Sequence, residues 1–343
     1  MGKIRILKTS YLKRKIKEYL IKLSLVDYRL LRKKKESKNL LIITLDALGD
    51  NIVKSKTIEI LTNEFRKENT YILCKNKWKS IYELQGYKNI FVDETKWSVF
   101  YKIKQYRKLN RIGFNTVAIM NHSYIPEEAD YILSGEKYDM SENVDYILDK
   151  HIIILKKILG KEFNLEDVKP DMRKYFLERK YKNIISIAIG TADYIKTPTY
   201  LNLKKYIQEL LKYKKEIYVL GSGEKQKKIA KKLKEEIKSD LIIDCIDTLT
   251  LKEVIQVIKD SELFIGGDSG LYNIAFSLGV NTICLHWSKQ KTPWEHKEEN
   301  IKILKGKGGR EFIDKKYGTD ILNSITFEQI QDSIEKLNIL MEK

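Results

Sequence analysis

Two short polar turns, far apart in the sequence, carry the side chains of this chain that are best suited to chemistry. The first holds Asp46 and Asp50 and follows an apolar run at 40–45. The second is Gly-Gly-Asp-Ser-Gly at 266–270, which follows another apolar run and precedes a short apolar helix at 271–278. A turn of this second kind leaves backbone N–H groups unpaired at the positive end of a helix, so it can seat an anion.

The residue types in these turns suit sugar and phosphate chemistry. A strand that ends at a polar turn puts the next carboxylate at the carboxyl edge of a sheet, where open α/β sheets bind ligands, and Asp50 has that place. Asp268 and Ser269 can bind sugar or ribose hydroxyls and an anionic leaving group. Each turn also has a plain structural explanation, in which Asp or Ser only caps the helix that follows.

The elements around the two turns predict an α/β protein with two Rossmann-like domains. Short apolar runs, typical of buried parallel strands, alternate with helical stretches. The expected strands lie at 40–45, 71–74, 90–92 and 116–120, then at 183–189, 216–220, 241–244, 263–265 and 281–285. The expected organisation is a basic amphipathic segment at 1–38, a first domain at 39–165, a second domain at 183–320 and a C-terminal helix at 321–343.

Three blocks of sequence support a more specific interpretation. They are Leu-Asp-Ala-Leu-Gly-Asp at 45–50, Gly-Thr-Ala-Asp-Tyr-Ile-Lys at 190–196, and the turn at 266–270 followed by Ala-Phe-Ser-Leu-Gly at 275–279. Together they resemble glycosyltransferase family 9, the heptosyltransferase family of lipopolysaccharide core assembly. The resemblance spans roughly residues 39–300, with the blocks in the family's order and at compatible spacing.

The resemblance implies the GT-B architecture, with an acceptor domain and a nucleotide-sugar domain facing across a cleft. It implies an inverting transfer of a sugar (heptose, by resemblance) from an ADP-heptose-like nucleotide-diphosphate sugar to a lipopolysaccharide core or other lipid-linked glycan. Asp50 matches the family's general base; Asp46 is the alternative, or it orients the acceptor. The donor-binding residues expected by resemblance are Thr191, Lys196, Glu224, Gly267, Asp268, Ser269, Gly270 and Asn273.

Two of these positions leave alternatives open. The family usually presents a histidine three residues after the last glycine of the turn, where this chain has Asn273, so the donor sugar stays open. Glu224 either faces the ribose or is an ordinary acid in the first turn of a helix. The sequence lacks Asp-x-Asp, the usual carboxylate pair for a metal-bound diphosphate. We therefore expect a metal-independent reaction without a cofactor, in which Lys196 and the helix end replace the cation.

The net charge of +18 is concentrated at the N-terminus, because residues 1–38 hold 14 Lys and Arg against three acids. Apolar residues recur there three and four positions apart, which predicts a basic amphipathic helix. They are Tyr11, Leu12, Ile16, Tyr19, Leu20, Leu23 and Tyr28. Such a helix either lies on an anionic membrane surface or packs on the body of the protein. The charge alone would also fit a nucleic-acid-binding protein, although no nucleic-acid-binding motif is present.

The cysteines and the hydropathy pattern indicate a compartment. Cys74, Cys245 and Cys284 are odd in number and lie in apolar runs, which favours a reducing cytosol over a disulfide framework. No stretch has the ~20 apolar residues of a membrane span, and no secretory signal is present. We expect a bacterial transferase that is cytoplasmic, peripheral on the inner face of the cytoplasmic membrane, and without a nucleic-acid partner. A non-catalytic protein of the same fold is the remaining alternative.

Overall fold

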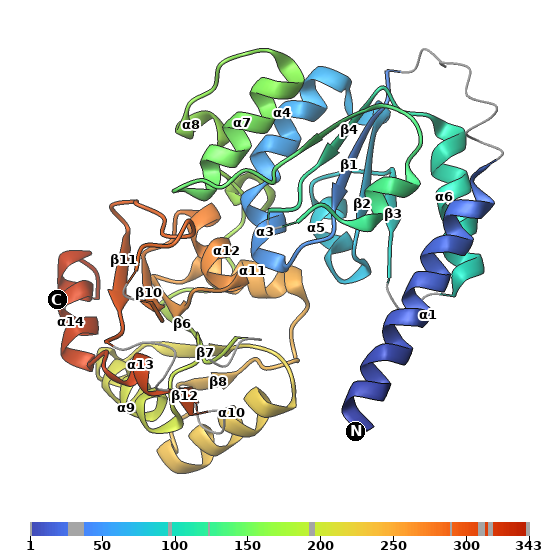
Figure 1. Cartoon of the computed structure of the whole chain (residues 1–343). Helices are drawn as coiled ribbons and strands as arrows, with labels where there is room; N and C mark the ends of the chain where they lie inside the picture. Colours follow the sequence, from blue (N-terminus) through green and yellow to red (C-terminus); the bar gives the residue numbers. More distant parts are fainter. Residues whose placement is uncertain are drawn as a thin grey trace. The chain divides into compact units, whose positions relative to one another are not determined.

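The computed structural model describes residues 2–26, 38–94, 98–122, 124–191, 196–288, 290–307, 313–314 and 318–340. Of the sequence features above, Tyr28 and residues 192–195 lie outside this set. The chain divides into two compact units, each built around its own sheet (Figure 1). The first unit comprises Met1–Asp46, Thr57–Asn143 and Lys150–Phe163, and the second comprises Ala47–Lys56, Val144–Asp149 and Asn164–Lys343.

A five-stranded parallel sheet forms the centre of the first unit, with the strand order β3-β2-β1-β4-β5. Its strands are β1 (Leu40–Thr44), β2 (Thr70–Cys74), β3 (Ile90–Val92), β4 (Thr116–Ile119) and β5 (Glu136–Asp139). Helices α1 (Gly2–Ser24) and α6 (Val99–Ile112) lie on one side of the sheet, and α4 (Ser55–Phe65) and α7 (Ile147–Leu159) lie on the other (Figure 1). The short helix α5 (Lys79–Leu84) connects β2 to β3. Because helices cover both faces, β1 is buried along its whole length.

A six-stranded parallel sheet forms the centre of the second unit, with the order β11-β10-β9-β6-β7-β8 typical of a doubly wound fold. Its strands are β6 (Ile184–Ala188), β7 (Glu216–Leu220), β8 (Ile242–Asp244), β9 (Leu263–Gly267), β10 (Thr282–His286) and β11 (Ile301–Lys305). The helices of this unit are α3 (Leu48–Val53), α8 (Leu165–Val168), α9 (Tyr200–Leu210), α10 (Glu224–Ile237), α11 (Leu251–Asp260), α12 (Gly270–Leu278), α13 (Asp320–Asn323) and α14 (Phe327–Lys336). A small antiparallel pair, β12 (Ile313–Asp314) and β13 (Gly318–Thr319), completes it.

The predicted α/β class with two parallel sheets is confirmed, and the structure adds two edge strands that the apolar pattern did not indicate. β5 has the sequence Glu-Lys-Tyr-Asp, pairs with β4 at the edge of the sheet and stays partly exposed. β11 alternates isoleucine and lysine over most of its length and pairs only with β10. A strand at the edge of a sheet needs fewer apolar side chains than a central strand, so its signal in the sequence is weak.

Helix α1 has apolar side chains on two opposite sides. Ile21 and Leu25 are 1% exposed and belong to the core cluster of the first unit. The positions predicted to form its apolar stripe face outward instead, at 42–66% exposure: Tyr11, Leu12, Ile16, Tyr19, Leu20 and Leu23. No helix in the described part of the chain is both long and apolar enough to cross a bilayer. All three cysteines are buried and unpaired.

Candidate functional site

The second sheet reverses its strand order between β6 and β9, and a doubly wound sheet binds its ligand at such a reversal. The loop after β6 contains Gly190 and Thr191, and the turn after β9 begins at Asp268. These loops are neighbours because β6 and β9 pair directly, with Ile187 opposite Ile265. The fold therefore brings together two of the segments expected to bind the donor.

Lys196 and Asp268 form an ion pair at this edge of the sheet, with Nζ 2.6 Å from Oδ2. The lysine side chain is 25% exposed and the aspartate side chain 7%, so the ammonium has an open side while the carboxylate is buried. A Cβ on Gly267 would stand 2.5 Å from the Lys196 carbonyl oxygen and 3.5 Å from Cγ2 of Thr191. The backbone can approach this closely only because residue 267 is glycine. Thr191, Lys196, Gly267 and Asp268 thus form one cluster.

Ser269 is the N-cap residue of α12, but its side chain does not act as a cap. A serine in this position normally accepts a hydrogen bond from the first turn of the helix. Here Oγ is buried and has no hydrogen-bond partner among the residues that the structure describes. A buried hydroxyl without a partner, next to the positive end of a nine-residue helix, is available to the oxygen atoms of a ligand. Together with the nearby lysine, these are groups that bind phosphate.

Helix α3, which carries Gly49 and Asp50, packs against α12 within the second unit (Figure 1). The helices approach most closely where two glycines meet. A Cβ on Gly49 would stand 3.2 Å from Cα of Gly270, and a Cβ on Gly270 would stand 2.9 Å from Cβ of Leu48. The blocks at 45–50 and 266–270 are therefore in contact. The segment Ala47–Lys56, placed on sequence in the first domain, clusters with the second unit for this reason.

Asp50 is the third residue of α3 and is half-buried. Its Oδ2 accepts the backbone N–H of Ala47 at 3.0 Å, so the carboxylate stabilises the start of the helix. An ionised carboxylate has lone pairs for about four hydrogen bonds. Capping of α3 and a contact with a substrate hydroxyl are therefore compatible roles for Asp50.

Asn273, which stands where the family usually has histidine, is held by a histidine from another part of the chain. Its Nδ2 donates to the carbonyl of Ser269 at 3.2 Å, and its Oδ1 accepts from Nε2 of His296 at 2.8 Å. Nδ1 of His296 lies 3.1 Å from the hydroxyl of Tyr146. The imidazole ring of His296 stacks on the ring of Phe276, with the two ring centroids 3.6 Å apart. Both polar atoms of the Asn273 amide are used within the protein. No spacing pattern in the sequence links His296 to Asn273, so the fold alone reveals the pair.

Burial lowers the pKa of His296 to about 3, so we expect an acid-dependent loss of stability at this residue. Below pH 6.5 the unfolded chain binds a proton on this histidine and the folded protein does not, so stability falls by up to ~1.4 kcal/mol per pH unit. Above pH 7 the effect is absent. Urea unfolding measured between pH 7.5 and 4.5 should show that the free energy of unfolding falls less steeply with decreasing pH in His296→Gln than in the native protein. Equal slopes for the two proteins would contradict this expectation.

Glu224 opens helix α10 with its side chain exposed. The preceding turn is held by two residues that the sequence analysis did not single out. The N–H of Gly223 donates to Oδ2 of Asp247 at 2.9 Å, and the N–H of Ser222 donates to Oε1 of Gln226 at 3.1 Å. In the described part of the chain, no contact joins Glu224 to the Lys196 cluster.

In the first sheet the strand order reverses between β1 and β4, and Asp46 lies directly beyond β1. Its Oδ1 accepts from Nδ2 of Asn121 at 3.0 Å, and its Oδ2 accepts the backbone N–H of His122 at 2.9 Å. The backbone carbonyl of Asp46 accepts the indole N–H of Trp78 at 2.9 Å. Asn121 and His122 follow β4, so this carboxylate is fixed at the reversal point of the first sheet, where a ligand is expected.

A cavity of about 1060 Å³ lies at the same edge of the first sheet. Leu45, Lys75 and Asp93, which follow β1, β2 and β3, form part of its lining, and α1 forms another wall. From α1, Lys17 contributes a partly buried ammonium, and burial together with the nearby Lys102 lowers the pKa of Lys17. The volume is at the upper end for ligand pockets, so the cavity has room for more than one sugar.

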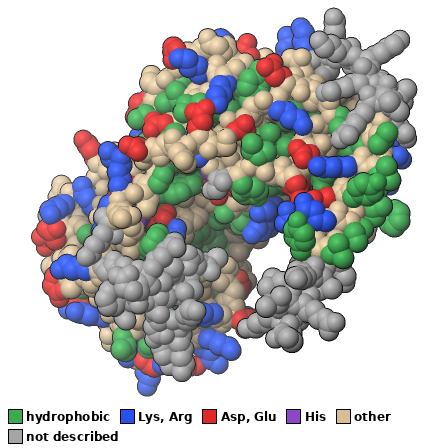
Figure 2. Space-filling model, in the orientation of Figure 1, with side chains coloured by type: hydrophobic (Ala, Val, Ile, Leu, Met, Phe, Trp, Pro, Cys, Tyr) green, Lys and Arg blue, Asp and Glu red, His purple; other side chains and the backbone are tan. Residues whose placement is uncertain are grey.

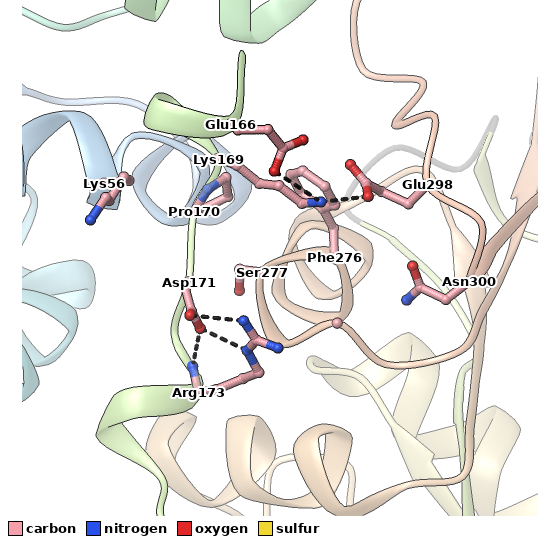
Figure 3. Close-up of a pocket in the computed structure, with 11 residues that line it drawn as sticks. Lys56, Glu166, Lys169, Pro170, Asp171, Arg173, Phe276, Ser277, Glu298 and Asn300 are labelled. Atoms are coloured by element: carbon pink, nitrogen blue, oxygen red, sulfur yellow. Dashed lines mark hydrogen bonds and ion pairs between the residues drawn. The ribbon is translucent and has the colours of Figure 1, made fainter. Parts of the chain in front are cut away.

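Another cavity, of about 460 Å³, lies at the opposite end of α12 beside Ser277 (Figure 3). Four of its charged side chains form two ion pairs, Lys169 with Glu298 and Arg173 with Asp171. The nine residues of α12 separate it from the turn at 266–270 by ~13 Å. Because the C-terminal end of a helix is its negative end, this cavity is poorly suited to a diphosphate.

Comparison with known proteins agrees with the geometry. Residues 163–316 match the model of glycosyltransferase family 9 (heptosyltransferase). A solved family 9 protein from Veillonella parvula DSM 2008 is 13% identical, with a TM-score of 0.70, over 89% of this chain and 99% of that chain. The E. coli heptosyltransferase WaaC, solved with ADP, is 12% identical, with a TM-score of 0.69, over 87% of this chain and 99% of that chain. E. coli ADP-heptose lps heptosyltransferase II is 13% identical, with a TM-score of 0.66, over 88% and 98%.

No curated protein matches the chain. At 12–13% identity the solved structures establish the fold, which is the GT-B architecture with two Rossmann-like domains. The family match establishes more, because it covers the segment that holds Lys196 and the turn at 266–270. Residues 163–316 match a family 9 domain, and with the fold this match indicates that the chain is a glycosyltransferase.

Proposed function

We propose that this protein is an inverting, metal-independent heptosyltransferase with an ADP-heptose-like donor and a lipid-linked glycan acceptor. The observation that carries the proposal is the cluster of Lys196, Asp268 and Ser269 at the strand reversal of the second sheet, inside the matched family segment. Two similar structures are described as WaaC with ADP and with ADP-2-deoxy-2-fluoro heptose. They support an adenosine diphosphate sugar as the donor here.

In this proposal the donor diphosphate lies on the turn at 266–270. The ammonium of Lys196, the hydroxyl of Ser269 and the N–H groups at the start of α12 bind its oxygens. Asp268 holds the lysine in place, and Thr191, Gly267, Gly270 and Asn273 shape the seat, with Glu224 directed to the ribose. Fixed positive groups stabilise the charge that develops on the leaving diphosphate. Since the sequence has no Asp-x-Asp pair, the lysine and the helix end take the part of a metal ion.

The proposed transfer is a single displacement. Asp50 accepts the proton of the acceptor hydroxyl while the hydroxyl oxygen forms a bond to C1 of the donor sugar. The bond between C1 and the diphosphate oxygen breaks, and its electron pair leaves with the nucleoside diphosphate. The configuration at C1 inverts. Asp46, at the end of β1, orients the acceptor.

The cavity beside α1 supports a glycan acceptor. It presents the partly exposed carboxylate of Glu94, which can accept hydrogen bonds from sugar hydroxyls. It also presents Lys75 and Lys77, which have no ion-pair partner in the part of the chain that the structure describes. Ammonium groups in the lining of a cavity suit the phosphate groups of a lipid-linked glycan.

Helix α1 supports placement of the protein on the inner face of the cytoplasmic membrane. Its outward side carries Leu12, Ile16, Leu20 and Leu23, and Figure 2 shows hydrophobic side chains beside Lys and Arg along this part of the surface. An apolar helix face flanked by basic residues binds the interface of an anionic bilayer. Because α1 also lines the acceptor cavity, a membrane bound to this face would lie close to the lipid of the acceptor.

We expect the exposed leucines of α1 to be required for vesicle binding. Leu12→Ser, Leu20→Ser and Leu23→Ser together should weaken binding to vesicles that contain an anionic lipid by about 10-fold or more, because apolar area is lost from the interface. Leu165, Leu177 and Leu201 are exposed leucines of the second unit, at 42–86% exposure, and their triple serine variant is the control. Co-sedimentation measures both. Equal binding by both variants, or tight binding to duplex DNA and none to vesicles, would contradict the membrane role.

Product analysis tests the proposed reaction. The purified protein, ADP-heptose and a lipid-linked core acceptor should give a heptosylated product with ADP release, unchanged by EDTA. The anomeric configuration of the product, measured by NMR, should be the opposite of the donor's. Retention of configuration, or loss of activity with EDTA and recovery with a divalent cation, would overturn the corresponding part of the proposal.

A further inference from the structure

A buried chain of side chains connects Asp46 to three residues that the proposed mechanism does not use. Nδ1 of His122 lies 4.0 Å from Oδ2 of Asp46. Nε2 of His122 lies 3.0 Å from Nε2 of His151, and Nδ1 of His151 lies 2.7 Å from Oγ1 of Thr57. These residues are between 0 and 7% exposed, and all belong to the first unit. They come from the ends of β1 and β4 and from α4 and α7.

The contacts favour one direction for the hydrogen bonds. If the Thr57 hydroxyl donates to Nδ1 of His151, then Nε2–H of His151 donates to Nε2 of His122. The proton of His122 is then on Nδ1, facing the carboxylate of Asp46. In the opposite direction a lone pair on Nδ1 of His122 would face the carboxylate, which is unfavourable. Both imidazoles are neutral in the favoured arrangement, with one donor and one acceptor nitrogen each.

The surroundings of the pair favour this neutral state. Nζ of Lys150 donates to the backbone carbonyl of His122, which places a cation next to this residue. Burial lowers the pKa of Lys150, and the negative charge of Asp46 opposes that shift. A nearby ammonium disfavours a second proton on either imidazole. The carboxylate of Asp46 is the acidic group at the His122 end of this chain of contacts.

We infer that His122 and His151 are positioning residues for Asp46. The chain from Thr57 fixes the His122 ring with its Nδ1–H toward the carboxylate, which holds Asp46 in one orientation at the strand reversal of the first sheet. This inference rests on the proposed function, in which Asp46 orients the acceptor. It assigns to two buried histidines a part in acceptor use and none in donor binding.

A double-mutant cycle tests the inference through kinetics. His122→Leu should lower kcat/KM for the acceptor roughly 10- to 100-fold, because a misplaced orienting group costs about this much, and should leave donor affinity unchanged. His122→Asn, whose amide can donate from the position of Nδ1, should recover most of the loss. In an Asp46→Asn background, His122→Leu should have little further effect. Independent, multiplying effects of the two changes, or an equal loss of donor affinity, would overturn the inference.

Nitrogen-15 NMR of the substrate-free protein tests the same arrangement without any assay of transfer. We expect the tautomer with Nδ1–H on His122 and the tautomer with Nε2–H on His151. The nitrogen-15 shifts of both imidazoles should change in Thr57→Val. Thr62→Val is the matched control, since Thr62 is a buried threonine of α4 that contacts Tyr87 instead. Nε2–H on His122 would overturn the assignment. If the native protein transfers no sugar but shows the expected tautomers, the proposed function fails and the assigned hydrogen-bond chain stands.

Discussion

Replacing Asp50 by Asn is expected to lower the turnover number about 10²–10⁴-fold and to leave the dissociation constant of the donor unchanged. Asparagine has the size of aspartate and keeps an oxygen that can accept the N–H of Ala47, so α3 should retain its first turn. What it loses is the capacity to take a proton from the acceptor hydroxyl. Steady-state kinetics and donor titration, made on the same preparation, separate the two effects.

A matched control for this change exists in the second unit. Asp167 caps the start of α8 as Asp50 caps α3, with the N–H of Asn164 donating to its carboxylate at 2.8 Å. Asp167→Asn should therefore reproduce any cost of altering a capping carboxylate and should leave turnover unchanged. A near-native rate for Asp50→Asn would remove Asp50 as the base and leave Asp46 as the candidate.

Replacing Lys196 by Ala is expected to weaken binding of the nucleoside diphosphate and of the donor roughly 10- to 100-fold. The change removes a charge-assisted contact, which is worth ~1.5–3 kcal/mol. It also leaves the buried carboxylate of Asp268, 2.6 Å from the lost ammonium, next to the phosphate. Lys196→Arg keeps the positive charge and should retain much of the affinity. Isothermal titration with ADP measures all three proteins.

Lys215 provides the control for a lost ion pair. Its Nζ lies 2.9 Å from Glu262, and its side chain is 15% exposed, but it lies outside the donor cluster. Lys215→Ala should unfold more readily than the native protein and bind ADP with unchanged affinity. If Lys196→Ala and Lys215→Ala bind ADP equally well, Lys196 does not contact the diphosphate.

Much of the architecture could be predicted from the sequence, because buried parallel strands leave continuous apolar runs. The runs at 40–45 and 263–265 correspond to β1 and β9, and each ends where the ligand side of its sheet begins. The blocks at 45–50 and 266–270 could be paired by resemblance. Their physical contact, which depends on the absence of a Cβ at Gly49 and Gly270, could only be seen in the fold.

The partners of the polar residues could not be predicted, because they come from segments without periodicity or motif. His296 reaches Asn273 from the loop after β10, and His122 reaches Asp46 from the loop after β4. In both cases a single residue acts through a contact across the fold, and a single residue leaves no spacing pattern. The exposed side of α1 is a different case: the stripe was visible in the sequence, but its exposure depends on Ile21 and Leu25 filling the core contact instead.

The thermal stability of the native protein with a panel of ADP-, UDP- and GDP-sugars tests the central claim, that the turn at 266–270 seats a nucleotide-diphosphate sugar. A ligand at 100 times its Kd stabilises the folded state by ~2.7 kcal/mol, which should raise Tm by roughly 5 °C or more. We predict such a shift with ADP-heptose, a smaller shift with ADP alone, and clearly reduced shifts with both ligands in Lys196→Ala at the same concentration. No shift with any nucleotide sugar, or an equal shift in Lys196→Ala, would contradict the claim.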